Sequence, residues 1–374
     1  MKLTDIATPA VVIDTARLER NIDAMQRGAA AAGFQLRPHA KTHKLPEVAR
    51  MQIARGAAGI CCAKPSEALV FAAAGIEDIR IPYPVHPSKQ HDILALMDLC
   101  RLSIIVDDAE VLSEWARVMG KAGRTLRVLV KVDVGFHRCG VDPVSPDALH
   151  LIALAAVLPG IELLGLLSHA GHGYHAASES ALALIAEEEV NALTRLAARG
   201  REKSVALSEI SIGSTPTARF SLTYAGPTEL RPGNYVYFDR TQVGLGAAGI
   251  DDCALTVLST VVSAHADRII LDAGSKTLTN DGARGFSALP GYGALSPSPD
   301  SAIRPHEGFT IERLSEEHAT VRVGPGAPAL RIGDRVRILP NHSCVVSNLV
   351  DHVHMADGDQ VTDRLPVAAR GRIT

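Results

Sequence analysis

Short apolar runs alternate with longer amphipathic segments between residues 34 and 240, and no low-complexity linker interrupts them. The longer segments carry apolar residues at helical spacing, as in residues 109–122 and 178–198. This alternation is typical of parallel strands joined by crossover helices, and eight repeats suit a closed α/β barrel of the (β/α)8 TIM type. The eight expected strands are residues 34–38, 58–62, 78–83, 102–107, 126–133, 163–169, 209–213 and 230–238.

The pattern changes beyond residue 240. Apolar and polar positions alternate there between Gly and Pro clusters, which is typical of antiparallel strands. The opening apolar run, residues 10–13, has the same character, and we expect it to pair with these strands. We therefore predict an additional antiparallel β domain formed by residues 1–14 and 241–374, beside a barrel of residues 15–240. Its expected strands include residues 254–263, 268–272, 319–323 and 335–339.

The composition limits the partners of the chain. Of its 374 residues, 47% are hydrophobic and 21% are charged, so the chain can bury a large core. A formal charge of -3 gives no electrostatic reason to expect nucleic acid or an anionic membrane. The chain has no apolar signal core at its N-terminus and no long apolar run, so we expect a cytoplasmic protein with a small-molecule ligand.

The most informative motif is residues 37–44, in which Lys41 stands between His39 and His43 after an expected strand. An amine beside imidazoles can be held neutral, and a neutral lysine can form a Schiff base with an aldehyde cofactor. The alternative interpretation is a basic surface loop. Further chemically active residues follow other strands of the expected barrel, where the loops that carry barrel active sites lie. These residues include Arg138 and the histidine-rich loop that begins at His169.

Two loops suggest what such a cofactor would carry. Gly213, Ser214 and Thr215 form a small hydroxyl-rich turn after a strand, where amides and hydroxyls can hold a phosphate; the alternative is an ordinary capped turn. The second loop offers a guanidinium to a pyridine nitrogen, a glycine that allows close approach, and a hydroxyl; it consists of Arg231, Gly233, Asn234 and Tyr235.

The expected β domain carries a candidate metal site. His342 and Cys344 lie two residues apart after a strand, and side chains at that spacing on an extended chain point to the same side. Imidazole with thiolate suits zinc, while manganese and magnesium are the alternatives that we consider. Simple packing of the two side chains is the other interpretation. A metal with open positions could bind a substrate hydroxyl as a Lewis acid.

With these motifs the sequence resembles the D-threonine aldolases and eukaryotic-type D-serine dehydratases, pyridoxal 5'-phosphate enzymes of the alanine racemase-like barrel fold (fold type III). The resemblance spans nearly the whole chain. It implies that Lys41 is the cofactor lysine, that Arg231 faces the pyridine nitrogen, and that His342 and Cys344 hold a catalytic metal. Arg138 is then expected at the phenolic oxygen of the cofactor. The resemblance also implies homodimers with shared active sites.

The resemblance leaves the reaction open between related chemistries. Aldolases of this kind usually carry an aspartate as the second metal ligand, so Cys344 favours the dehydratases. The expected reaction is β-elimination from a D-β-hydroxy amino acid such as D-serine or D-3-hydroxyaspartate, with Lys41 removing the α-proton and keto acid and ammonia as products. The alternative is retro-aldol cleavage to glycine and an aldehyde, with His43 as the base. An amino-acid racemase and a non-catalytic cofactor carrier are further alternatives.

Overall fold

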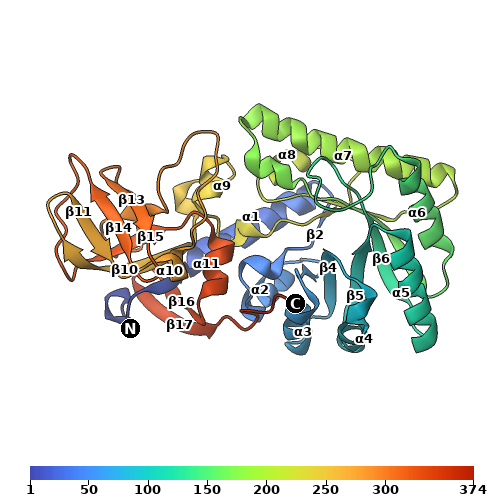
Figure 1. The fold of residues 1–374 in the computed structure, drawn as a ribbon, viewed down its shortest axis with the longest axis horizontal. Coiled ribbons are helices and arrows are strands. Elements are labelled where there is room, and N and C mark those ends of the chain that lie inside the picture. The colour runs from blue at the N-terminus through green and yellow to red at the C-terminus, as the bar shows by residue number, and fades with distance from the viewer.

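The computed structural model describes residues 1–374 and contains two separate sheets, which lie side by side along the long axis of the molecule (Figure 1). The first is an eight-stranded parallel sheet in the order β2-β9-β8-β7-β6-β5-β4-β3. A parallel bridge between His39 and Cys61 joins its two end strands, so the sheet closes as the predicted barrel. Its strands are β2 (Gln35–Leu36), β3 (Ile60–Cys61), β4 (Asp78–Pro84), β5 (Arg101–Val106), β6 (Leu126–Lys131), β7 (Ile161–Leu167), β8 (Glu209–Ile212) and β9 (Glu229–Leu230).

Helices surround this sheet, and their ends follow local sequence signals. In α5 (Ala109–Ala122), the Asp108 side chain accepts a hydrogen bond from the Val111 amide, and Gly123 ends the helix in the left-handed region. Its buried side chains recur at helical spacing. The other helices here are α1 (Thr15–Ala31), α2 (Pro46–Ala54), α3 (Pro65–Ala73), α4 (Gln90–Leu99), α6 (Pro146–Val157), α7 (Glu179–Glu202), α8 (Ala218–Ser221) and α9 (Arg240–Gly244).

The second sheet has nine strands and takes in the N-terminal strand, as predicted. β1 pairs with β10 in antiparallel register and with β16 in parallel register, so the sheet is rich in antiparallel pairs without being wholly antiparallel. The domain boundaries at residues 14 and 240 stay a prediction. The strands are β1 (Ala10–Asp14), β10 (Leu255–Ala264), β11 (Arg268–Leu271), β12 (Ala294–Ser296), β13 (Phe309–Leu314), β14 (Ala319–Val323), β15 (Arg335–Leu339), β16 (His352–Asp357) and β17 (Gln360–Pro366).

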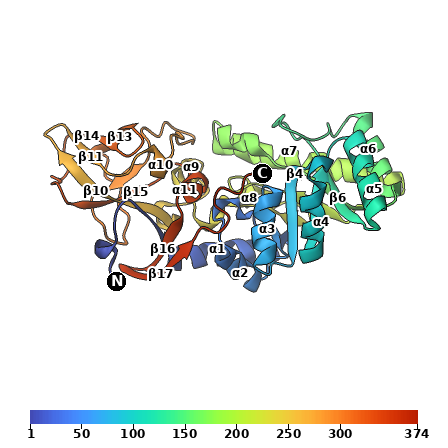
Figure 2. The ribbon, with the colours of Figure 1, turned by 60° about the horizontal axis from the view of Figure 1, so that its bottom comes forward.

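The two parts meet where α11 (Ser343–Leu349), which follows β15, packs against the short 3-10 helix η2 (Ala40–Thr42) of the barrel. Figures 1 and 2 show α11 between the second sheet and the barrel helices. The small helix α10 (Ser275–Leu278) lies near α11. This contact brings the residues that follow β15 to the barrel rim.

One strand prediction was wrong. Of the expected strand at residues 230–238, only Leu230 lies in a strand, as the last residue of β9, and residues Asn234–Val236 form a 3-10 helix. Pro232 has no amide hydrogen to donate to a neighbouring strand, and Gly233 turns the chain with φ -125° and ψ -52°. The apolar residues beyond this turn are nevertheless buried.

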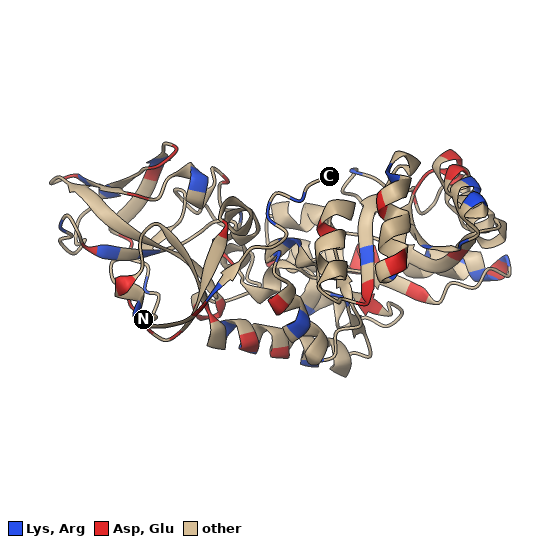
Figure 3. Ribbon diagram, turned by 90° about the horizontal axis from the view of Figure 1, so that it is seen from below, with Lys and Arg blue, Asp and Glu red and all other residues tan.

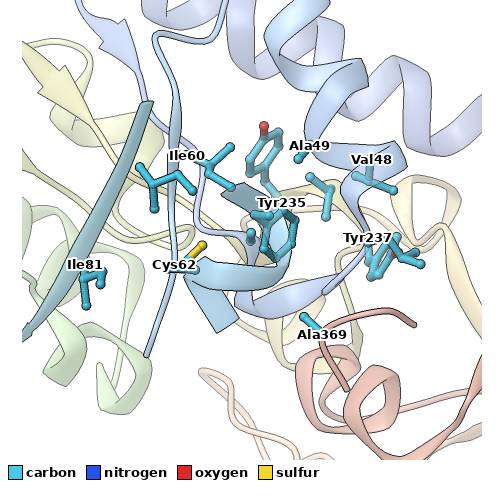
Figure 4. Packing of buried hydrophobic residues seen from close by; sticks show 14 of the residues in the cluster. Val48, Ala49, Ile60, Cys62, Ile81, Tyr235, Tyr237 and Ala369 are labelled. Atoms are coloured by element: carbon cyan, nitrogen blue, oxygen red, sulfur yellow. The ribbon is translucent and has the colours of Figure 1, made fainter. Parts of the chain in front are cut away.

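A large hydrophobic core fills the space between the barrel and its helices. Cys61 and Cys62 are fully buried within the fold, and no disulfide is present. Figure 4 shows Cys62 and Tyr235 among aliphatic side chains of this core. Acidic and basic residues are interspersed over both parts of the molecule in the view of Figure 3. Every helix is too short or too polar to be a candidate for crossing a membrane.

Candidate active site

A cavity of about 290 Å³ opens at the carboxyl ends of the barrel strands, where the second sheet meets the barrel. The structure brings most of the predicted site residues to it, although they come from distant parts of the chain. Those that line it are Lys41, Arg138, His169, Ser214, Thr215, Arg231, Gly233, Asn234, His342 and Cys344.

Lys41 lies in the 3-10 helix that follows β2, and its exposed side chain lines the cavity. His39 precedes this helix, and its Nδ1 atom accepts a hydrogen bond from the Lys41 amide at 3.3 Å. Burial lowers the pKa of His39 well below its ordinary value, and the positive charges of Lys41 and Arg231 lower it further. His39 is therefore neutral at pH 7 and fixes the backbone that carries Lys41.

Arg231 is buried beneath the cavity and is oriented by β8 and by the residue that follows β7. Its Nε donates to Ser211 Oγ at 2.6 Å, and one terminal nitrogen donates to the Ser168 carbonyl. Its other terminal nitrogen, Nη1, makes no hydrogen bond. A donor without a partner at the wall of a cavity is suited to an acceptor atom of a bound molecule.

The turn after β8 has the backbone conformation that a close approach requires. Gly213 has φ +101°, and a Cβ atom there would lie 2.6 Å from Leu230 Cδ1. Ser214 and Thr215 line the cavity, and Thr215 Oγ1 accepts from the Tyr235 amide at 3.2 Å. Gly213 itself does not line the cavity, and its carbonyl lies 3.3 Å from His169 Nδ1. These residues can hold an anionic group through hydroxyls and amides without a basic side chain.

His169 contacts this turn and is also neutral. Burial lowers the pKa of His169 well below the ordinary value, and the positive charges of Lys41 and Arg231 lower it further. The 3.3 Å contact with the Gly213 carbonyl makes Nδ1 the donor, which leaves Nε2 without a proton. A neutral imidazole can pack against a flat ligand at no electrostatic cost.

The candidate metal ligands are adjacent, but their local structure differs from the expected extended chain. His342 precedes α11, and Cys344 lies in its first turn. His342 Nδ1 lies 2.6 Å from Asp281 Oδ2, and Cys344 Sγ lies 3.2 Å from Thr42 Oγ1. No third His, Cys, Asp or Glu completes a metal-binding group.

The two ligands share an ionic interaction. Burial alone would raise the pKa of the Cys344 thiol, but the hydrogen bond and the positive charge of His342 bring it below the ordinary value. Burial alone would lower the pKa of His342. The contact with Cys344 outweighs this effect and raises the pKa to about 10. A thiolate is the form of cysteine that binds a metal ion.

Besides Gly213, two predicted site residues lie outside the cavity. His43 is fully buried, its Nδ1 accepts from the Leu45 amide at 3.1 Å, and burial lowers its pKa to about 3. A 3-10 helix has three residues per turn, so Lys41 and a side chain two positions later face different directions. Tyr235 is also buried, and its hydroxyl accepts from Gln52 Nε2 at 2.9 Å, so only its backbone amide reaches the site.

The cavity also contains residues that the sequence analysis did not select. Lys131 ends β6 and is buried, and burial lowers its pKa to about 8. A charged residue at the carboxyl end of an apolar strand is a signal that could have identified it. Tyr174 and Arg284 also line the cavity. Arg284 and the His342 partner Asp281 come from a glycine-rich loop between α10 and β12, which has no periodic pattern from which to predict their position.

The floor of the barrel holds a second set of charged residues. Glu229 is buried and accepts from Arg37 Nε at 2.7 Å, Arg80 Nη1 at 2.5 Å and Ser211 Oγ at 2.5 Å. Arg37 also donates to Asp78 at 2.5 Å. Because Ser211 accepts from Arg231, this network links the barrel floor to the cavity above it.

Comparison with known proteins places this barrel in a defined class. The family model "Alanine racemase, N-terminal domain" matches residues 13–241, and the model "Putative serine dehydratase domain" matches residues 254–356. The fold is therefore the alanine racemase-like barrel followed by a dehydratase-type β region.

The chain belongs to the family of D-threonine aldolases and D-serine or D-3-hydroxyaspartate dehydratases. It is 38% identical to a D-threonine aldolase from Arthrobacter sp., over 99% of this chain and 94% of the relative. It is 36% identical to the D-threo-3-hydroxyaspartate dehydratase of Delftia sp. (strain HT23), over 91% of this chain and 92% of the relative. The solved structure of that dehydratase superposes with a TM-score of 0.90 at 32% identity, covering 98% of each chain.

Solved variants of a D-threo-3-hydroxyaspartate dehydratase bear on the metal site. One replaces a histidine by alanine, and another replaces a cysteine two positions further on and is in a metal-free form. The spacing of those two residues equals that of His342 and Cys344 in this chain.

Proposed function

We propose that this protein is a pyridoxal 5'-phosphate- and divalent-metal-dependent lyase that dehydrates D-β-hydroxy-α-amino acids to keto acid and ammonia. The observation that carries the proposal is one cavity in which Lys41 from the barrel lies with His342 and Cys344 from the β region. Relatives at 36% and 38% identity are named for lyase reactions on amino acids of this kind.

The cavity fits the cofactor. Lys41 offers a free amine, Arg231 has the partnerless Nη1 for the ring nitrogen, and the Ser214 and Thr215 turn offers hydroxyls for the phosphate. The cofactor would supply an aldehyde for the substrate amine and a conjugated ring that stabilises negative charge at the α-carbon. An arginine donates to the ring nitrogen without giving up its proton, so the ring is a weak electron sink.

The metal pair fits a borderline-soft divalent ion, and zinc is the ion that we propose. Imidazole and thiolate supply two ligands, which leaves positions for the substrate and water. The ion would act as a Lewis acid toward the β-hydroxyl of the substrate. Asp281 accepts from His342 Nδ1, which leaves Nε2 as the ligand atom and fixes the ring orientation.

Within this arrangement the side chains of the protein have distinct tasks. Lys41 would remove the α-proton, while His342 and Cys344 would hold the ion that polarises the β-hydroxyl. Loss of the proton and the hydroxide gives an enamine, which takes up water and releases ammonia and the keto acid. Since Arg231 leaves the ring a weak sink, proton loss and hydroxide departure are nearly concerted.

Cysteine as the second ligand favours the dehydratase over the aldolase reaction. The spacing of replaced residues in the solved dehydratase variants supports this choice. The second candidate is D-threonine aldolase chemistry, which is favoured by the 38% identical Arthrobacter relative. It would need a base other than His43, because that imidazole is buried outside the cavity.

One incubation tests the proposal. The holoenzyme is mixed with D-serine, D-threonine and D-threo-3-hydroxyaspartate, and keto acid and ammonia are measured against glycine and aldehyde. Keto acid with equimolar ammonia supports the dehydratase, and glycine with aldehyde would establish the aldolase instead. Chelation should abolish either lyase reaction, whereas a racemase or a cofactor carrier would be unaffected. The homodimer with shared sites and the cytoplasmic location stay predictions.

A further inference from the structure

The charged residues around the cavity are all of one sign. Its lining includes five lysine or arginine residues and no aspartate or glutamate. The five are Lys41, Lys131, Arg138, Arg231 and Arg284. Lys131 and Arg231 are buried and the other three are exposed. A set of cations around a cavity whose lining has no carboxylate favours ligands that carry several negative charges.

Four of these cations already have a partner or a proposed task. Lys41 and Arg231 are assigned to the cofactor, Lys131 Nζ donates to the Val132 carbonyl at 2.8 Å, and the Arg138 guanidinium lies 5.0 Å from the Phe136 ring centroid. Arg284 is different. Its side chain makes no hydrogen bond or ion pair, and only its backbone amide donates, to Thr241 Oγ1 at 3.2 Å.

Arg284 lies on the metal side of the cavity. It lines the main cavity with Tyr174 and His342, and the same three residues line a small second cavity together with Asp239 and Asp281. The loop that carries Arg284 is fixed, because Asn341 Nδ2 donates to the carbonyls of Asp281 and Gly291 at 3.0 and 2.9 Å. Both acids already have partners: Asp281 contacts His342, and Asp239 accepts from Asn234 Nδ2 and the Ser343 amide.

The position beside the metal ligands determines which part of a substrate Arg284 can reach. In the proposed function, the metal held by His342 and Cys344 binds the β-hydroxyl. The hydroxyl and the β-substituent are attached to the same carbon, so the substituent must lie beside the metal as well. A guanidinium there offers two parallel donors, which match a carboxylate.

We infer that Arg284 binds a second carboxylate on the β-carbon, so that the preferred substrate is a dicarboxylic D-β-hydroxy amino acid of the 3-hydroxyaspartate type. This inference rests on the proposed function and deepens it. D-Serine and D-threonine, which have hydrogen or methyl at this position, would leave the guanidinium without a partner.

The test compares substrates that differ at that one group. The holoenzyme and its Arg284→Ala and Arg284→Lys variants are assayed with D-threo-3-hydroxyaspartate, D-threo-3-hydroxyasparagine and D-serine. For Arg284→Ala, kcat/KM should fall about 30-fold on the dicarboxylate and less than about 3-fold on the two neutral substrates. Arg284→Lys should be intermediate, because lysine keeps the charge and loses the paired donors.

Ser287→Ala, in the same loop, is the matched control and should leave all three values unchanged. An equal loss on all three substrates for Arg284→Ala would overturn the inference, because it would mean that Arg284 binds the α-carboxylate or supports the loop. Equal efficiency of the wild-type protein on the acid and its amide would also overturn it, while leaving the dehydratase in place. No turnover of any D-β-hydroxy amino acid would overturn the proposed function and the inference together.

Discussion

The floor of the barrel and its mouth, where the cavity opens, both contain charged residues, but they differ in burial and in how those charges are paired. On the floor, Arg37 and Arg80 share Glu229, and Arg37 also contacts Asp78. At the mouth, Lys41, Arg138 and Arg284 make no ion pair with the protein. Paired buried charges hold strands together, whereas unpaired charges at a cavity are available to ligands.

This difference separates residues that maintain the fold from residues that carry the reaction. Removing a mouth residue should change activity and leave the free energy of unfolding almost unchanged. Removing a floor residue should leave a buried charge without its partner and lower that free energy. The following experiments test the separation, beginning with the largest expected effect.

Lys41→Ala should abolish turnover, with a loss on the order of 10⁴-fold or more in kcat, because the proposed base and cofactor link are removed together. The visible absorbance of the lysine-bound cofactor should disappear, and the urea unfolding midpoint should stay within error of the wild type. Lys203→Ala, at an exposed position after α7, is the control. Full turnover by Lys41→Ala would contradict both the assignment and the comparison.

Glu229→Ala should lower the free energy of unfolding by about 3–5 kcal/mol, because Arg37 and Arg80 would stay buried without their shared carboxylate. Urea denaturation followed by circular dichroism measures this change. Glu312→Ala breaks a half-exposed pair with Arg322 and should cost less than about 1 kcal/mol. Similar losses of unfolding free energy in the two variants would remove the distinction between charges on the barrel floor and charges on the surface.

Asp281→Asn should weaken metal binding about 10- to 100-fold, because the amide no longer holds the Nδ1 proton of His342 as strongly. Competition with a chromophoric chelator gives the zinc affinity without an activity assay. Asp300→Asn, at an exposed position, should not change it. Unchanged zinc affinity in Asp281→Asn would show that this carboxylate has no role in the metal site.

The acid stability of the protein should depend on Glu229. Burial would raise its pKa, but Arg80 and Arg37 lower it from 4.5 to about 2. The stability that ionised Glu229 contributes is therefore present above pH 4.5 and is lost as the pH falls toward about 2. Unfolding midpoints measured across this interval should fall more steeply for the wild type than for Glu229→Gln. Parallel pH profiles for the two proteins would contradict this prediction.

The barrel was predictable because the sequence of each strand and helix carries its own local pattern of apolar and polar residues. The amphipathic pattern of residues 109–122 gave α5 with its observed bounds, and the turns after β2 and β8 fell at the cavity as expected. The expected strand at residues 230–238 failed because Pro232 and Gly233 outweigh the apolar residues around them. The expectation that His43 lies at the site failed because the 3-10 turn directs its side chain into the core.

The sequence by itself determined the repeating strands and helices, the lysine between two histidines, and the paired histidine and cysteine, since these depend on near neighbours in the chain. Only the tertiary structure decided that Thr42 and Cys344, 302 residues apart, are in contact. It also placed Asp281 on His342 and left Arg284 unpaired. Such contacts arise when the closed barrel and the second sheet pack together, and no local periodicity encodes which loop side chains then meet.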